Sequence, residues 1–185
     1  MVQFSYREYY VLSKKCNVVE LENFGKINLV NFIDMSSEEK KCVLNIRNHP
    51  DVRMWMYDSE EISQDEHLKF IESLKDNLTR QYFLVKQTHF ILGVVYFNID
   101  TKCEAAEFGL YANPMEAIKG KGSALQETVI IYAFNYLKVS TLKLEVYEKN
   151  EKAIKLYKKY NFQLVRTEYK NNKSVLYMKL NVVNK

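Results

Sequence analysis

A short basic segment with two glycines, Lys119-Gly120-Lys121-Gly122-Ser123-Ala124, has the residue types of an anion-binding turn. Glu107–Tyr111, upstream of it, has the composition of a strand, and an apolar run that ends at Leu137 follows it. Closely spaced glycines let the backbone approach an anion, and a helix start offers unpaired N–H groups and the positive end of the helix dipole. The segment therefore predicts a phosphate or pyrophosphate site, with an ordinary strand-to-helix turn as the alternative.

Two familiar nucleotide-binding motifs do not fit this segment. Gly120-Lys121-Gly122 lacks the third glycine of the dinucleotide-binding fingerprint, and no Gly-Lys-Ser/Thr sequence closes a P-loop. The bound group is therefore expected to be another phosphate-bearing cofactor.

A second stretch that could bind a substrate lies in residues 45–57. Polar and aromatic side chains are interspersed in it, at Arg47, Asn48, His49, Arg53, Trp55 and Tyr57. Because Pro50 disfavours helix at His49, a helix should end at Asn48 and a loop should follow. The loop is interpreted as a substrate wall or, alternatively, as a segment whose aromatic side chains pin it to the core.

Composition is that of a globular protein with one domain. The 185 residues are enough for a substantial core, and the hydrophobic (47%) and charged (27%) fractions are ordinary. No run approaches the roughly 18 apolar residues that a membrane span needs. Residues 1–15 lack the apolar core of a signal peptide, so we expect a cytoplasmic protein.

Charge and cysteine usage narrow the function classes further. The net charge of +4 suits an anionic substrate, but the lysines are dispersed through the chain, so no nucleic-acid partner is expected. The three cysteines and three histidines are widely scattered, which argues against a disulfide framework and against a metal site.

Strands and helices must position these residues. Apolar alternation predicts strands over residues 27–33, 82–85, 90–97, 104–111, 142–147, 162–169 and 173–180. Capping boxes, an apolar run and an asparagine N-cap predict four helices, which open at Ser36, Ser63, Ser123 and Asn150. His67 falls on the apolar stripe of the second helix, where we expect it to be packed rather than catalytic.

Domain organisation is expected to be simple. The chain has no internal repeat, low-complexity block or linker, so residues 26–182 are predicted to form a single α+β domain. Residues 1–25 form an N-terminal extension to which no role is assigned, although Phe4–Leu12 has residues suited to a strand or a docking segment.

The order of elements and several residues together resemble the Gcn5-related N-acetyltransferase (GNAT) family. That family's acetyl-CoA loop, Gln/Arg-x-x-Gly-x-Gly/Ala, fits residues 119–124 with Lys119 in the first place. A later family signature fits Asn150, Ala153, Tyr157 and Phe162. Asn161 stands where glycine is usual, and asparagine tolerates the left-handed backbone of such a turn. The resemblance covers residues 26–180.

The resemblance implies a fold and a cosubstrate. The fold is a mixed, mostly antiparallel sheet of about seven strands with splayed central strands, flanked by about four helices. Acetyl-CoA is the implied cosubstrate, and no metal is required. The residues implied in binding it are Leu110, Tyr111, Ala112, Lys119, Gly120, Lys121, Gly122, Ser123, Ala124 and Asn150.

The resemblance also implies catalytic residues for direct transfer of the acetyl group to an amine. Tyr157 would protonate the leaving thiolate, since a phenol with a pKa of about 10 stays protonated at neutral pH. The alternative is that Tyr157, which lies on an apolar stripe, is only a core residue. Glu145 would take the amine proton through water, with His49 and His67 as rivals.

Within the family, five segments resemble the acetyltransferases of bacterial pseudaminic acid biosynthesis: residues 47–50, 55–57, the His67-containing helix, 82–84 and 107–111. This implies transfer to the 4-amino group of a UDP-linked amino-deoxy-altrose, a precursor of the sugar that decorates flagellin. Charge and stacking would then assign the sugar nucleotide to Arg47, His49, Trp55 and Tyr82.

Two other functions stay open from the sequence. One is a protein N-terminal acetyltransferase of the ribosomal-protein type, and the other is an acyl-CoA-binding module without catalysis. Arg47 and the aromatic side chains near it favour an anionic sugar nucleotide over a peptide. We expect a monomer or a homodimer that acts on a small molecule without a membrane partner.

Overall fold

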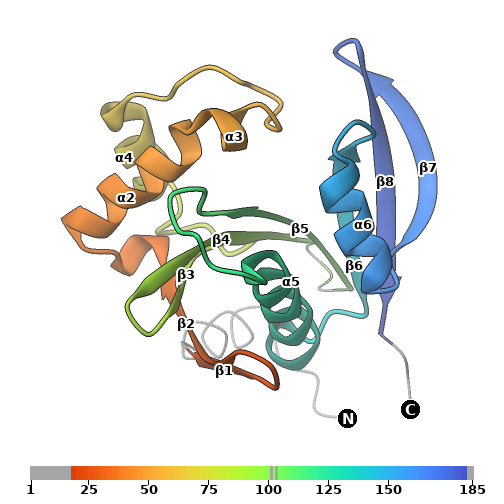
Figure 1. Ribbon diagram of the computed structural model, residues 1–185, viewed down its shortest axis with the longest axis horizontal. Coiled ribbons are helices and arrows are strands. Elements are labelled where there is room, and N and C mark those ends of the chain that lie inside the picture. Colours follow the sequence, from red (N-terminus) through yellow and green to blue (C-terminus); the bar gives the residue numbers. More distant parts are fainter. Residues whose placement is uncertain (1–17, 101, 103, 183–185) are drawn as a thin grey trace.

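The computed structural model describes residues 18–100, 102 and 104–182. Eight strands form one sheet in the order β1-β2-β3-β4-β5-β6-β8-β7 (Figure 1). They are β1 (Val18–Leu21), β2 (Gly25–Asn31), β3 (Arg80–Gln87), β4 (Phe90–Ile99), β5 (Ala105–Ala112), β6 (Thr141–Tyr147), β7 (Gln163–Lys170) and β8 (Lys173–Asn181). All neighbours pair antiparallel except β5 and β6, which are parallel. The mixed, mostly antiparallel sheet is confirmed, with one strand more than about seven.

Helices cover both faces of the sheet. They are α2 (Ser37–Asn48), α3 (Pro50–Arg53), α4 (Gln64–Glu72), α5 (Lys121–Ile131) and α6 (Glu151–Lys159), together with a 3₁₀ turn, η1 (Phe32–Asp34), and a π-helical segment, η2 (Tyr132–Leu137). Figure 1 shows α2, α3 and α4 on one side, with α5 and α6 on the other. The sheet therefore lies between two helical layers.

Strand alternation explains the two cores. Successive side chains on a strand point to opposite faces. Phe83 on β3 accordingly joins Leu125 and Val129 of α5 in the larger core, whereas its neighbour Leu84 joins Ile71 of α4 in the smaller one. The predicted apolar helix after the glycine segment is thus buried against the sheet.

The helix starts follow the predicted capping boxes. Ser36 and Ser63 each accept a hydrogen bond from the backbone three residues on and are capped in return by a glutamate. The helix α2 ends at Asn48, as predicted, but the expected loop after it is wrong, because Pro50 opens the short helix α3 with His49 as its N-cap. Proline suits a first helical position, since its missing N–H would have no helical partner there.

The strands β5 and β6 separate partway along their length. Their parallel pairing includes only Ala105–Glu107 with Thr141–Lys143. Beyond Glu107, β5 continues to Ala112 paired with β4 alone. The predicted splay of the central strands is therefore confirmed.

The N-terminal side of the sheet differs from expectation. The first described strand is β1, whereas the sequence placed the first strand at residues 27–33. Val19 and Leu21 of β1 are buried in the larger core, so these residues belong to the same sheet as the rest. The features predicted within residues 1–17 lie outside the described residues, and the boundary between residues 25 and 26 falls inside the β1–β2 hairpin.

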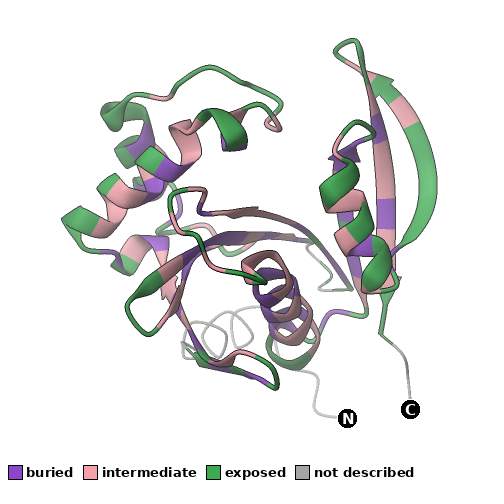
Figure 2. Ribbon diagram, viewed as in Figure 1, coloured by how far each residue is buried: buried purple, intermediate pink, exposed green. Residues whose placement is uncertain are grey.

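The C-terminal hairpin was predicted correctly. The strands β7 and β8 turn at Asn171 and Asn172, both with positive φ (48° and 58°), which suits a two-residue hairpin loop. The outer strand β7 is largely exposed (Figure 2). Among the described residues no helix is long and apolar enough to cross a membrane, and no group of three or more His, Cys, Asp or Glu side chains could hold a metal ion.

Candidate active site

The glycine segment forms the start of α5. Gly120 is its N-cap, with a left-handed backbone (φ 82°) and no side-chain capping bond. The helix begins at Lys121, two residues before the predicted Ser123, and its first turn has no acidic residue. The N–H groups at this helix start and the dipole behind them are therefore available to an anion.

Gly122 leaves space that the protein itself does not use. Among the described residues, a Cβ added there would meet only Leu156 Cδ2, at 3.7 Å, which is an ordinary van der Waals contact. Glycine lowers helix stability by about 0.5–1 kcal/mol relative to alanine, so packing within the chain does not explain its presence. The space fits a group that approaches the helix start closely, as a pyrophosphate does.

The lysines around this segment differ in their contacts. Lys121 folds back, and its Nζ donates hydrogen bonds to the carbonyl oxygens of Asn113 and Glu116. Its pKa is lowered by burial and by the charge of Lys152 on α6. Lys121 thus fastens the turn, while the exposed Lys119, together with Lys152, adds positive charge near the helix start.

Past Glu107, one edge of β5 has no other strand of the described residues beside it. Leu110, Tyr111 and Ala112 pair with β4 on one side, whereas the pairing with β6 has already ended at Glu107. Backbone groups that point away from β4 are therefore open to a ligand that lies along this edge. Asn150 begins α6, and its Oδ1 accepts a bond from Ala153 N at 3.2 Å.

Tyr157 of α6 lies beside the opening between β5 and β6. Its ring contacts Phe108, the first β5 residue past the β6 pairing, at 6.1 Å between centroids, and Phe162 at 5.9 Å. Burial raises the pKa of Tyr157, as does the neighbouring Tyr96, so the phenol stays protonated. Its hydroxyl makes no hydrogen bond to a described residue. Tyr157 is thus a core residue that still has a free proton donor.

Glu145 lies on the opposite face of the sheet from α5. The Tyr57 hydroxyl donates a hydrogen bond to its Oε2, and Lys170 Nζ lies 3.5 Å from its Oε1. Burial and the Glu145 carboxylate raise the pKa of Tyr57. Both carboxylate oxygens of the predicted base are therefore already engaged.

Glu107 is a second carboxylate that the sequence reasoning missed. It pairs with Lys143 in register, and Glu145 follows Lys143 by two residues on the same strand face. Partial desolvation and the Glu145 charge raise the pKa of its carboxyl group, although the residue as a whole keeps exposed surface. No hydrogen bond or ion pair joins this side chain to another described residue. In the sequence, Glu107 could have been recognised as the charged residue in a strand that is otherwise apolar.

Tyr96 is the second residue that the sequence reasoning missed. A Cβ on Gly109 would lie 2.2 Å from Tyr96 Cζ and Oη, so the tyrosine lies directly across this glycine. Burial, followed by the Tyr82 and Glu107 charges, raises the pKa of Tyr96 to about 12. Tyr96 also contributes to the raised pKa of Tyr157, so the two side chains lie near each other. Only the strand register brings Tyr96 opposite Gly109.

The Tyr82 ring packs against the Tyr96 ring. The two rings stack at 4.8 Å, and the edge of Phe70 packs on Tyr82 at 5.0 Å. Arg80 also lies over the Tyr82 ring. These neighbours engage the ring that was predicted to stack on the substrate.

Arg47 lies in the last turn of α2, close to these side chains. Its Nη2 donates to the carbonyl oxygen of Asp58 at 3.0 Å, whereas its Nη1 is buried and has no hydrogen-bond partner among the described residues. The guanidinium charge acts against the pKa increase of Tyr96 and of Tyr111, so it lies near both. A buried, unpaired guanidinium N–H is a ready site for an anion.

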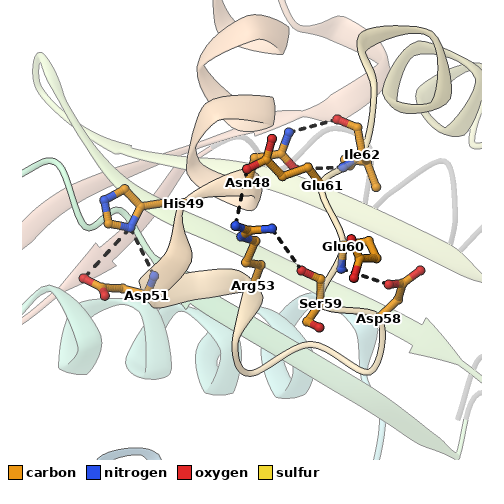
Figure 3. A network of polar contacts seen from close by, with 9 residues as sticks. All are labelled: Asn48, His49, Asp51, Arg53, Asp58, Ser59, Glu60, Glu61 and Ile62. Carbon is orange, nitrogen blue, oxygen red and sulfur yellow. Dashed lines mark hydrogen bonds and ion pairs between the residues drawn. The ribbon is translucent and has the colours of Figure 1, made fainter.

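The connection between α3 and α4 is tied down along its length (Figure 3). Asn48 exchanges two hydrogen bonds with the backbone of Ile62, at 2.8 and 3.0 Å. Arg53 bonds the carbonyl of Ser59 at 3.4 Å and pairs with Glu61 at 3.4 Å. At its other end the connection reaches β6, through the Tyr57 hydroxyl. It therefore bridges the two halves of the sheet.

The remaining predicted residues have mainly structural contacts. His49 accepts a hydrogen bond from Asp51 N at 3.2 Å as the cap of α3, and its ring points away from Ser59 in Figure 3. His67 is buried, with Nε2 3.0 Å from the Lys40 carbonyl oxygen, and burial lowers its pKa. Trp55 is half-buried in the turn after α3. The structure does not bring either histidine to the Glu145 side chain.

Comparison with known proteins identifies similar sequences and folds. A sequence model of the Acetyltransferase (GNAT) family matches residues 45–162. Acetyltransferase PseH of Campylobacter jejuni (strain ATCC 700819 / NCTC 11168) is 43% identical over 153 residues, 82% of this chain and 92% of the relative. The crystal structure of C. jejuni N-acetyltransferase PseH in complex with acetyl coenzyme A aligns with TM-score 0.67 and 35% identity, over 84% of this chain and 98% of that one.

A more distant likeness concerns the fold alone. Spermidine N-acetyltransferase from Vibrio cholerae, in complex with CoA and spermine, aligns with TM-score 0.76 but only 19% identity. That alignment covers 84% of this chain and 95% of the other. The sheet and helical layers are therefore shared well beyond proteins of similar sequence.

Proposed function

Because the chain belongs to the Acetyltransferase (GNAT) family, and is an acetyl-CoA-dependent N-acetyltransferase, we propose that it acts on a nucleotide sugar. The acceptor is the 4-amino group of UDP-4-amino-4,6-dideoxy-N-acetyl-β-L-altrosamine, in pseudaminic acid biosynthesis for flagellin glycosylation. The likeness to PseH over most of both chains supports this acceptor.

The arrangement of side chains around the β5–β6 opening supports the proposal most directly. The opening between β5 and β6 has the unbonded Tyr157 hydroxyl beside it, and Glu107, Glu145 and Arg47 belong to the opposite sheet face. A thioester that enters from the α5 side would thus meet an amine that enters from the other side. Positioning of this kind supplies much of the acceleration in a direct transfer.

The α5 side is proposed to hold the cosubstrate. Acetyl-CoA supplies the acetyl group and a thiolate leaving group. The free N–H groups at the start of α5 would bind its pyrophosphate, with Gly122 leaving room for it and Lys119 adding charge. The open backbone edge at Leu110–Ala112 would bind the pantetheine amides, with Asn150 close to the start of α6.

The reacting groups need a proton donor and a base. Tyr157 would give its hydroxyl proton to the leaving sulfur, which its raised pKa permits because the phenol stays protonated. Glu145 was predicted as the base, but Tyr57 and Lys170 already engage both of its oxygens. Glu107, which has no such partners, is favoured to take the amine proton through water, with Glu145 raising its pKa.

The acceptor side is proposed to select an anion. Arg47 offers a buried N–H that no described residue accepts from, and guanidinium groups bind phosphate oxygens strongly. Trp55 lies in the same connection and remains a candidate for uracil stacking. His49 and Tyr82 would act less directly, as the cap of α3 and as the support of Tyr96.

The proposed setting is the cytoplasm, as a monomer or homodimer without nucleic-acid or membrane partners. Size-exclusion chromatography with light scattering distinguishes the two assembly states. A trimer or larger oligomer would contradict this part of the proposal.

The decisive experiment measures free-thiol release from acetyl-CoA with the UDP-linked 4-amino sugar and, separately, with a panel of amino-terminal peptides. Turnover on the sugar alone is expected. Turnover on peptides alone would replace the acceptor and keep the fold, the cosubstrate and Tyr157 as the proton donor. Acetyl-CoA binding without turnover on any amine would indicate a non-catalytic binding module.

A further inference from the structure

An aromatic ring from the N-terminal hairpin packs directly on the glycine that caps α5. A Cβ added to Gly120 would lie 3.1 Å from Cε1 and 3.3 Å from Cζ of Phe24. Real Cβ atoms rarely approach other atoms this closely, so a side chain at residue 120 would push the ring away by a few tenths of an ångström. Phe24 precedes Gly120 by 96 residues, about half the length of the chain.

The hairpin holds Phe24 in place from several directions. Val19 and Leu21 of β1 are each 1% exposed and belong to the core formed with α5. Phe24 N donates to the Leu21 carbonyl at 3.3 Å, and Gly25, with φ 66°, turns the chain into β2. The Phe24 carbonyl accepts a hydrogen bond from Gln87 Nε2. The Phe24 backbone is therefore held relative to the sheet, and its partly buried ring packs against the larger core.

The contact matters because, among the described residues, no side chain forms a capping hydrogen bond at this end of α5. Gly120 has a left-handed backbone, and no side chain bonds to the N–H groups of the first turn. A glycine is the most flexible residue of a chain, so its conformation must be held by its neighbours. Phe24 packs on Gly120, and Lys121 binds the carbonyls of Asn113 and Glu116 in the segment before the turn.

We propose that Phe24 is a positioning residue for acetyl-CoA: its ring holds Gly120 in the conformation that directs the N–H groups of α5 at the pyrophosphate. The inference rests on the proposed cosubstrate site at the start of α5. It gives Phe24, which lies in the extension of residues 1–25 to which the sequence assigned no role, a part in cosubstrate affinity. Phe24 itself needs no contact with acetyl-CoA.

The expected consequence is a loss of affinity without a loss of chemistry. A turn that is no longer held must be ordered by the ligand, and that ordering weakens binding. Phe24→Ala should therefore raise the KM and Kd for acetyl-CoA about tenfold, while kcat at saturation stays within about twofold. The KM of the acceptor should be unchanged.

Three variants separate positioning from general destabilisation. Phe24→Leu keeps an apolar side chain against Gly120 and should recover most of the affinity that Phe24→Ala loses. Val19→Ala removes buried atoms from the same hairpin without changing the Phe24 ring, so it should lower the free energy of unfolding while leaving the KM for acetyl-CoA near that of the parent. Urea unfolding, calorimetric titration with acetyl-CoA and steady-state kinetics are measured on each full-length variant.

The possible outcomes distinguish the positioning role from the cosubstrate site itself. If Phe24→Ala binds acetyl-CoA as tightly as the parent, the positioning role is wrong. If Phe24→Ala and Val19→Ala lose affinity in proportion to their lost stability, the role is also wrong, because the effect is then general. If the parent binds acetyl-CoA but Gly122→Asp binds it equally well, the proposed cosubstrate site at α5 is at fault instead.

Discussion

The two sides of the β5–β6 opening are built in different ways. On the α5 side the candidate binding groups are largely backbone N–H and C=O groups, supplied by the helix start at Gly120 and the free edge of β5. On the other side they are side chains, Arg47, Tyr96, Glu107 and Glu145, from four elements spread along the chain. One side of the site is thus built from backbone groups of a helix start and a strand edge, and the other from side chains that are far apart in the sequence.

The two sides should therefore tolerate substitution differently. Backbone groups are present whatever the side chains are, so the α5 side depends on space and conformation, which Gly120 and Gly122 provide. The acceptor side depends on the identity and charge of each side chain. Substitutions should accordingly affect acetyl-CoA on one side and the acceptor or the proton transfer on the other.

The largest expected effect is that of charge at the α5 start. Gly122→Asp places a carboxylate where the pyrophosphate is proposed to bind, so acetyl-CoA binding should fall by more than about a hundredfold. Gly122→Ala is the matched control, because a Cβ has room there, 3.7 Å from Leu156. It should weaken binding far less, and both variants should fold. If calorimetric titration gave Gly122→Asp the same affinity for acetyl-CoA as the parent, the proposed pyrophosphate site at the start of α5 would be wrong.

The next effect tests which carboxylate accepts the proton. Glu107→Gln should lower kcat/KM by about 10²- to 10⁴-fold, and Glu145→Gln by less. The base must be ionised, so the raised pKa of Glu107 moves the acidic limb of the pH–rate profile to higher pH. Loss of the Glu145 charge lowers that pKa, and the limb of Glu145→Gln should move to lower pH. A larger loss in Glu145→Gln than in Glu107→Gln would restore Glu145 as the base.

Tyr157→Phe should lower kcat roughly a hundredfold with little change in the Kd for acetyl-CoA, because the hydroxyl acts on the departing thiolate. Tyr160→Phe is the control at the end of the same helix, since its hydroxyl bonds Glu127 at 2.7 Å. That variant should keep the parent kcat. Steady-state kinetics in which Tyr157→Phe equals the parent would make Tyr157 a core residue only.

Arg47→Gln should raise the KM of the UDP-sugar about tenfold or more, since hydrogen bonds to charged groups contribute about 1.5–3 kcal/mol. The KM for acetyl-CoA should not change. Arg53→Gln is the matched control, because Arg53 only ties down the same connection through Ser59 and Glu61. Equal effects of the two variants on the sugar KM would mean that Arg47 merely orders the connection.

The smallest effect concerns a buried amide one turn after Gly122. Gln126 is fully buried, and neither its Oε1 nor its Nε2 has a hydrogen-bond partner among the described residues. Gln126→Leu should therefore raise the free energy of unfolding by about 1–3 kcal/mol. Gln81→Leu should lower it, because the buried Gln81 accepts a bond from the Tyr132 hydroxyl at 3.1 Å. Urea unfolding in which Gln126→Leu was the less stable of the two would contradict this reasoning.

Sequence patterns predicted helix caps and turns correctly where these features depend on residues that are close together in the chain. The capping boxes at Ser36 and Ser63, the turn at Asn171-Asn172 and the left-handed Asn161 (φ 63°) all depend on neighbouring residues. The glycine segment was recognised for the same reason. The short helix α3 was missed, although Pro50 at a first helical position was a readable signal.

Periodicity and chemistry within a few residues were enough to predict the alternation of strands and helices, the helix start at the glycine segment and the place of Tyr157 on an apolar stripe. The three-dimensional arrangement was needed to show that Tyr57 and Lys170 engage Glu145, that Tyr96 lies across Gly109 and that Phe24 packs on Gly120. Such contacts depend on strand register and on which elements the sheet brings together, and neither is encoded in any single stretch of the chain.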